Sequence, residues 1–95
     1  MAAYYVADID VTDPEQYKTY AAGAPATVEA HGGRYLVRGG ATQTLEGDAD
    51  PRRFVSIEFP DTAFLQAWYS SDEYTRLREI RQSCSTGNVF TAEGV

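Results

Sequence analysis

The stretch AYYVADIDVTDPEQY, residues 3–17, predicts how the chain begins to fold. Its first part alternates in polarity and is rich in β-branched and aromatic residues, which indicates a strand over residues 3–11. One side of this strand carries Tyr5, Ala7, Ile9 and Val11. Thr12 or Asp13 can then cap a helix, because Pro14 suits a first helical position. The stretch therefore predicts a strand that leads directly into a helix.

The first helix is expected to run from Pro14 to the glycine pair Gly32-Gly33, which ends it. Its buried face is marked by side chains at helical spacing, namely Tyr17, Tyr20, Ala21, Ala24, Val28 and His31. Pro25 lies in the middle of this run. Because proline donates no backbone hydrogen bond, we expect Pro25 to kink or split the helix.

Two further strands follow the glycine pair. Residues 34–40 form the second strand, and residues 41–47 are expected to continue it after a bulge or bend at Gly39-Gly40. Residues 48–53 are a turn, and residues 53–59 alternate as a third strand.

The second half of the chain repeats the plan of the first. Pro60-Asp61-Thr62 opens a helix that carries Phe64, Leu65 and Trp68 on one face. Ser70 or Ser71 then provides a new cap, and the last helix runs to about Ser83. Residues 87–93 form the closing strand.

This order of elements predicts one domain over residues 1–95 with an α+β fold of the split βαβ, or ferredoxin-like, type. A four-stranded antiparallel sheet carries both helical segments on one face. Along the strands, both phases contain large apolar side chains, so the opposite face is not simply solvated. We therefore expect a second copy of the chain to cover it, which makes a homodimer.

Charge and composition exclude several classes of partner. The net charge of the 95 residues is −6, and a protein that binds nucleic acid or an anionic membrane needs a cationic surface instead. The lone Cys84 cannot form an internal disulfide, and no segment is typical of a signal peptide or a membrane span. We expect a cytoplasmic protein.

Three residues of the last helix form the first candidate site. Leu77, Ile80 and Cys84 define the expected buried stripe, and Tyr74, Arg78 and Arg81 follow one ridge at its edge. Two guanidinium groups and a phenol could clamp a carboxylate or an enolate there. The alternative is structural: the arginine stems cover the edge of the core and their charges pair with acidic residues.

A second candidate site lies at Arg38-Gly39-Gly40, where a ligand can approach the backbone closely. The alternative is that Arg38 pairs with Glu58 across the sheet. Trp68 and Tyr69 are core or interface aromatics, or the wall of a pocket.

Evidence for catalysis in the sequence is weak. His31 and Glu58 are candidate bases, although His31 near a helix end also suits a purely structural role. With one His and one Cys, the sequence predicts no metal site, and it indicates no cofactor.

Several segments resemble the family of the domain of unknown function 1330: ADIDVTDPEQYKTY, HGGRYLVRGG, IEFPD, AWYSSDEY, LREIRQ and the closing EGV. The resemblance covers nearly the whole chain. It implies a ferredoxin-like fold that pairs into a dimeric α+β barrel, a superfamily that includes cofactor-free monooxygenases, lactone isomerases, dehalogenation enzymes and haem enzymes. The family itself supplies no catalytic assignment. The site positions that the resemblance implies are Arg38, Gly39, Gly40, Trp68, Tyr69, Ser71, Tyr74, Arg78 and Arg81.

Taken together, these patterns predict a protein that binds a small anionic, partly apolar organic molecule between helix and sheet. Cofactor-independent oxygenation or isomerisation, with His31 or Glu58 as the base, is one alternative. A structural dimer without a ligand is the other.

Overall fold

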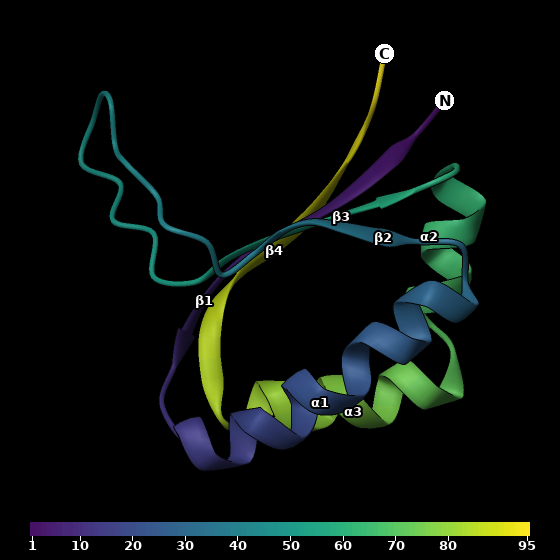
Figure 1. Cartoon of the computed structure of the whole chain (residues 1–95), viewed down its shortest axis with the longest axis horizontal. Coiled ribbons are helices and arrows are strands. Elements are labelled where there is room, and N and C mark those ends of the chain that lie inside the picture. Colours follow the sequence, from purple (N-terminus) through teal and green to yellow (C-terminus); the bar gives the residue numbers. More distant parts are fainter.

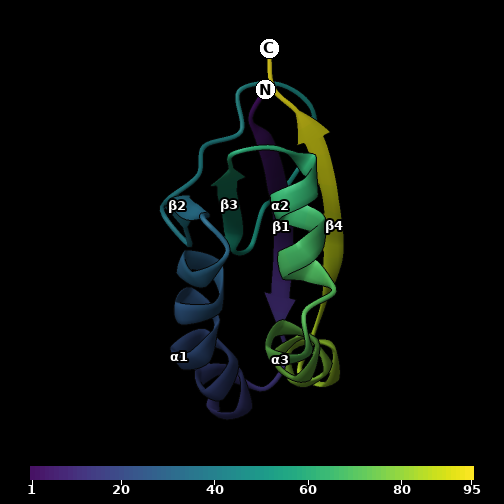
Figure 2. The same ribbon diagram turned by 90° about the vertical axis from the view of Figure 1, so that its right-hand side faces the viewer.

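The computed structural model describes residues 1–95 and has the expected ferredoxin-like α+β fold (Figure 1). Four strands form one antiparallel sheet in the order β2-β3-β1-β4. All helices lie on the same side of this sheet (Figures 1 and 2). The elements are β1 (Ala3–Val11), α1 (Pro14–Ala30), β2 (Arg34–Arg38), β3 (Phe54–Phe59), α2 (Thr62–Tyr69), α3 (Asp72–Ser83) and β4 (Ser85–Glu93).

The core lies between the sheet and the helices. Alternate residues of β1 face the helices and are buried, so that Tyr5 packs edge-on against Trp68 with 5.1 Å between ring centroids. Trp68 in turn stacks on Tyr74 of α3 at 4.0 Å, and its Nε1 donates a hydrogen bond to Thr27 of α1. The Trp68 side chain of α2 therefore contacts the sheet and both of the other helices.

The helices begin at side-chain caps. Asp13 accepts a hydrogen bond from the backbone N–H of Gln16, and Asp61 accepts one from Phe64. The Ser71 hydroxyl accepts from the N–H of Tyr74 and so starts α3 directly after α2. Because these caps satisfy donors that the first turn leaves free, they set where each helix begins.

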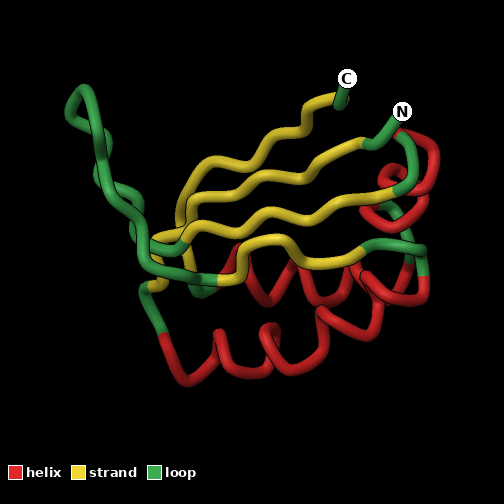
Figure 3. Tube along the Cα trace, turned by 45° about the horizontal axis from the view of Figure 1, so that its top comes forward, coloured by secondary structure: helices red, strands yellow, loops and turns green.

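Pro25 does not split α1, which runs unbroken from Pro14 to Ala30. Two expectations about the segment that follows α1 are wrong. Residues 41–47 form no strand but belong to the long loop between β2 and β3, which projects from the end of the sheet (Figures 1 and 3). The bulge of β2 lies between Tyr35 and Val37 rather than at the glycine pair.

The bulge decides where Arg38 lies. Tyr35 pairs with Ile57, and after the irregularity Arg38 pairs with Val55. Ile57 and Val55 both face the helices, so the extra residue brings Arg38 to the same face as Tyr35. Without the bulge, regular alternation along β2 would put these two side chains on opposite faces.

The buried side of α3 also differs from the expected stripe. Tyr74 and Arg81 are buried, whereas Leu77 and Ile80 are only partly buried. Leu77 packs toward Gly23 of α1, where the missing side chain leaves room for it. With α3 packed closely against α1 in this orientation, Arg81 lies on the buried side of α3.

No helix covers the opposite face of the sheet, as the edge-on view in Figure 1 shows. Val6 and Phe90 are register partners on this face, and the Phe90 side chain is 58% exposed. We call this surface, centred on Val6, Phe90 and Phe54, the open face. None of the helices combines the length and hydrophobicity that crossing a bilayer requires.

Candidate functional site

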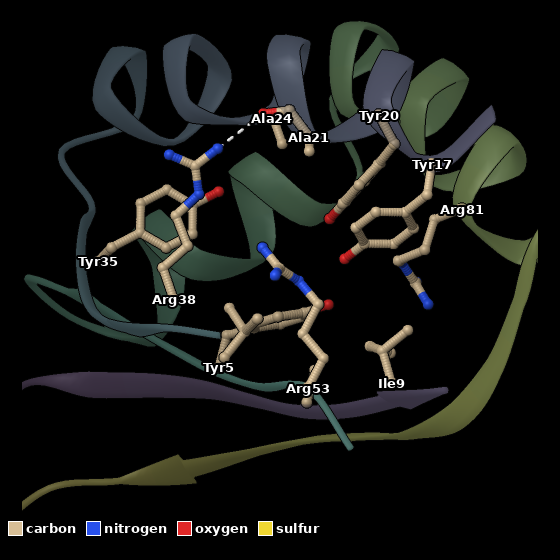
Figure 4. Close-up of a pocket in the computed structure, with 12 residues that line it drawn as sticks. Tyr5, Ile9, Tyr17, Tyr20, Ala21, Ala24, Tyr35, Arg38, Arg53 and Arg81 are labelled. Carbon is tan, nitrogen blue, oxygen red and sulfur yellow. Dashed lines mark hydrogen bonds between the residues drawn. The ribbon is translucent and has the colours of Figure 1, made fainter. Parts of the chain in front are cut away.

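A cavity between α1, α3 and the sheet brings together charged and aromatic side chains from four elements and from the residue that precedes β3 (Figure 4). No Asp or Glu lines it, although the chain has 14 acidic residues. We call it the arginine–tyrosine cavity, after Arg38, Arg53, Arg81, Tyr5, Tyr17, Tyr20 and Tyr35. Its free space is about 20 Å³, which is room for about one water molecule.

Arg81 is the most deeply buried charge of the chain, with 5% of its surface exposed. It forms no ion pair, and its Nε has no hydrogen-bond partner. Burial favours a lower pKa for Arg81, but the surrounding phenols of Tyr5, Tyr74 and Tyr20 outweigh it and the pKa is raised. The guanidinium therefore stays charged inside the protein without a carboxylate beside it.

Arg38 closes one side of the cavity. Its Nη2 donates a 2.8 Å hydrogen bond to the Ala21 carbonyl, which is drawn as a dashed line in Figure 4. This carbonyl is four residues before Pro25, and proline has no N–H to donate to it. Pro25 thus leaves an acceptor on α1 that Arg38 uses.

Arg53 lies between the other two arginines in Figure 4. Its guanidinium is 5.4 Å from the ring centre of Tyr17, and its Nε also lacks a hydrogen-bond partner. Gly39 packs directly against this guanidinium and has a positive φ of 72°. A side chain at position 39 would both strain the backbone and displace Arg53.

The tyrosines of the cavity are neutral hydrogen-bonding groups at neutral pH. The hydroxyl oxygens of Tyr20 and Tyr74 are 2.8 Å apart. Burial raises the pKa of Tyr5 and of Tyr20, and it raises the pKa of Tyr35 to about 12. These phenols can therefore donate to an anion but do not act as bases near pH 7.

The raised pKa values predict a loss of stability in alkali. Unfolded tyrosines ionise near pH 10, whereas the buried ones keep their protons, so stability is fully present below about pH 10 and falls as the pH rises further. Each such tyrosine should contribute about 1.4 kcal/mol per pH unit to this fall. Urea unfolding from pH 8.5 to 11.5 measures it, and Tyr20→Phe should make the slope shallower. An equal slope in both proteins would contradict the assignment to Tyr20.

Among the residues that the sequence singled out, Arg38 and Arg81 line the cavity together. Gly39 lies next to Arg53, as described above, whereas Gly40 contacts neither arginine. The proposed pairing of Arg38 with Glu58 is wrong, because Glu58 accepts its hydrogen bonds from Arg34 and Tyr4.

Five other candidates, Trp68, Tyr69, Ser71, Tyr74 and Arg78, do not line the cavity. Trp68 and Tyr74 are fully buried in the core, and Ser71 caps α3. Arg78 stacks on Tyr69, with 4.4 Å between its guanidinium and the ring centre, and donates to the Tyr69 carbonyl. The ridge of Tyr74, Arg78 and Arg81 is therefore divided: only Arg81 reaches the cavity.

The two candidate bases lie elsewhere. His31 follows α1, where its Nδ1 is 2.9 Å from the Thr27 carbonyl oxygen. Glu58 lies on the open face, and its hydrogen bonds with Arg34 and Tyr4 lower its pKa. The Cys84 thiol is buried, which raises its pKa, and no group of three metal-ligating side chains is present.

The sequence reasoning missed Arg53 and the tyrosines. Arg53 is in phase with Val55 and Ile57, which face the helices, so the alternation of β3 could have identified it. Tyr17 and Tyr20 were assigned to the buried face of α1, but as core residues only. No pattern in the sequence showed that the bulge of β2 turns Arg38 toward them.

Solved structures similar to this chain share its fold at low sequence identity. A protein of unknown function from Rhodopseudomonas palustris is 15% identical, with a TM-score of 0.81 over 99% of this chain and 82% of that one. A dimeric ferredoxin-like protein of unknown function from Jannaschia sp. CCS1 is 16% identical, with a TM-score of 0.66 over 99% and 100% of the two chains. SnoaB, a cofactor-independent oxygenase from Streptomyces nogalater, is 12% identical, with a TM-score of 0.63 over 99% and 93%.

No curated protein sequence is significantly similar to the chain. The family model of the domain of unknown function DUF1330 matches residues 2–95. This match agrees with the resemblance noted from the segments HGGRYLVRGG and AWYSSDEY. The chain therefore belongs to the DUF1330 family.

Proposed function

We propose that this protein binds a small, partly apolar organic anion whose charged group contacts Arg81. The observation that carries the proposal is a buried guanidinium without an ion pair. Burying a charge without a partner is costly, and natural proteins rarely retain such a charge for stability. A carboxylate ligand would supply the missing partner.

The surroundings of Arg81 support an anion over a cation or a neutral ligand. Arg38 and Arg53 add two positive charges to the same cavity, and the neutral phenols of Tyr5 and Tyr20 add hydrogen-bond donors. With no acidic residue in the lining, every charge there has the same sign. Arginine also suits the planar shape of a carboxylate, which can accept two parallel hydrogen bonds.

The remaining candidates have supporting places in this proposal. Trp68 and Tyr74 hold the inner wall from behind, since Tyr74 stacks on Trp68 and bonds to Tyr20. Arg78 and Ser71 hold Tyr69 and the start of α3 in place. They would act by positioning the residues that touch the ligand.

Cofactor-independent oxygenation or isomerisation receives less support. Such a reaction needs a group that removes a proton from the substrate. The cavity offers phenols with raised pKa values, while neither His31 nor Glu58 lines it. Similarity to SnoaB at 12% identity bears on the fold rather than on the reaction. Binding is therefore the function that the site favours.

Isothermal titration calorimetry tests the proposal with 1-naphthoate as the probe and the neutral 1-naphthamide as its control. We expect the carboxylate to bind and the amide to bind at least about 30-fold more weakly, as for a buried charged contact. Equal affinity for the two compounds would refute an anion site. Mass spectrometry of the freshly purified protein under native conditions would identify any carboxylate that it carries from the cell.

We also propose that the chain forms a homodimer through the open face. Val6 and Phe90 lie there with no covering element, and exposed apolar surface of this kind is typical of an interface. The similar protein from Jannaschia is dimeric by its description.

Val6→Glu should convert the dimer into a monomer, because it would bury two carboxylates against the same apolar surface. Light scattering coupled to size exclusion measures the mass, and the exposed Leu45→Glu in the β2–β3 loop is the control. A wild-type protein that is monomeric at micromolar concentration would refute the dimer.

A further inference from the structure

A groove on the β4 side of Arg81 offers much more room than the arginine–tyrosine cavity. It consists of two adjoining hollows of about 250 and 260 Å³ that share Tyr69 and Val89 in their walls. Arg81, Gln82, Ser85 and Thr86 line its polar half. Leu65, Tyr69, Val89 and Phe90 line its apolar half. We call the whole hollow the β4 groove.

Arg81 belongs to both hollows of the molecule, because its side chain lines the arginine–tyrosine cavity and the polar half of the groove. In Figure 4 its guanidinium points away from α3 toward Ile9 of β1, the strand that pairs with β4. Tyr5 likewise lines both the cavity and the apolar half. Arg81 and Tyr5 thus form the partition between the two spaces.

Size decides between the two sides. The cavity has room for about one water molecule, whereas small-molecule sites enclose about 300–1,000 Å³. The two halves of the groove together fall in this range. Entry from the opposite side would also require Arg38 to leave the Ala21 carbonyl. The groove needs no such rearrangement.

The chemistry of the groove is graded along its length. One end is polar: it is lined by Arg81, whose Nε has no hydrogen-bond partner, and by Gln82 and Ser85. The other end has the aromatic ring of Tyr69 and the aliphatic side chains of Leu65 and Val89. No acidic side chain lines either half. This gradient matches an aromatic monocarboxylate that lies along β4 with its charged end at Arg81.

We infer that the β4 groove holds the body of the ligand, an aromatic monocarboxylate, and that only its carboxylate contacts the partition at Arg81. The inference rests on the proposed function, since both require an anion at Arg81. It adds the direction of approach and the ligand class. The arginine–tyrosine cavity then serves as the rigid, positively charged wall behind the carboxylate.

Chemical shift mapping with 1-naphthoate on the ¹⁵N-labelled protein tests the location directly. We expect the backbone amides of Gln82, Thr86, Val89 and Thr91 to move, and those of Ala21, Ala24 and Tyr35 to move much less. The opposite pattern would place the ligand in the arginine–tyrosine cavity and overturn the inference while leaving the proposed function intact. If no amide signal shifts, the result would contradict both the inference and the proposed function.

A matched pair of variants gives a second test. Gln82→Glu puts a carboxylate in the wall of the polar half, where it repels a carboxylate ligand, so the affinity for 1-naphthoate should fall at least about 10-fold. Ser83→Glu adds the same charge at the next residue, which is exposed and outside the groove, and should change the affinity little. Equal effects of the two variants would attribute the loss to net charge and overturn the inference.

Discussion

Replacement of Arg81 by methionine should lower the affinity for 1-naphthoate at least about 30-fold, because the loss of a buried charged partner costs about 2 kcal/mol or more. Methionine has a similar length and no charge, so it fills the space of the arginine stem. Calorimetry on both proteins measures the difference. Arg76→Met is the matched control, since Arg76 lies on the exposed side of the same helix.

The same substitution should leave the free energy of unfolding unchanged or raise it. Arg81 is buried and unpaired, and replacing such a charge with an apolar side chain is often neutral or stabilising. A structural arginine would behave in the opposite way, and its loss would destabilise the fold. If Arg81→Met lowers the urea midpoint and binding persists, Arg81 serves stability and the proposed function fails.

Trp68→Ala should reduce the free energy of unfolding by about 3–5 kcal/mol, the range for removing a large aromatic from a core. Trp68 is fully buried and contacts the rings of Tyr5, Phe59 and Tyr74. The variant also removes the donor to Thr27. Small domains have total free energies of unfolding of about 5–15 kcal/mol, so this substitution would remove a large part of the stability of the protein.

Urea denaturation followed by circular dichroism measures this loss. Phe64→Ala in the same helix is the control, because the Phe64 side chain is 47% exposed and has less apolar surface to lose. We expect the control to cost less than about 1.5 kcal/mol. A Trp68→Ala protein as stable as the control would contradict the packing of Trp68 against the sheet and α3.

Local patterns of the sequence determined the order and type of the elements. Alternation over residues 3–11 marked β1, and the possible caps Thr12 or Asp13 and Ser70 or Ser71 marked to within one residue where α1 and α3 begin. These signals are local: side-chain periodicity follows from backbone geometry, and a cap needs only residues a few positions away. The duplicated order then indicated the ferredoxin-like fold, which the structure has.

Loop 39–53 shows that strand propensity alone does not determine where a strand forms. Residues 41–47 have strand-like composition in part, but a continuation of β2 would need the residues before Phe54 to extend β3 as its partner, and residues 48–53 form no strand. The continuous course of α1 through Pro25 is also a tertiary effect. The carbonyl that Pro25 leaves without its helical donor receives one from Arg38, a residue of another element.

The candidate site was visible in the sequence only as separate arginines. Arg81 was placed at the rim of the core, and the packing of α3 against α1 buried it instead. The bulge of β2 turned Arg38 to the helical face, and the phase of β3 brought Arg53 between them. Which charges share a cavity, and which of them lack a carboxylate, depends on contacts between residues far apart in the chain. Those contacts are decided by how the helices pack on the sheet, for which periodicity along one element carries no information.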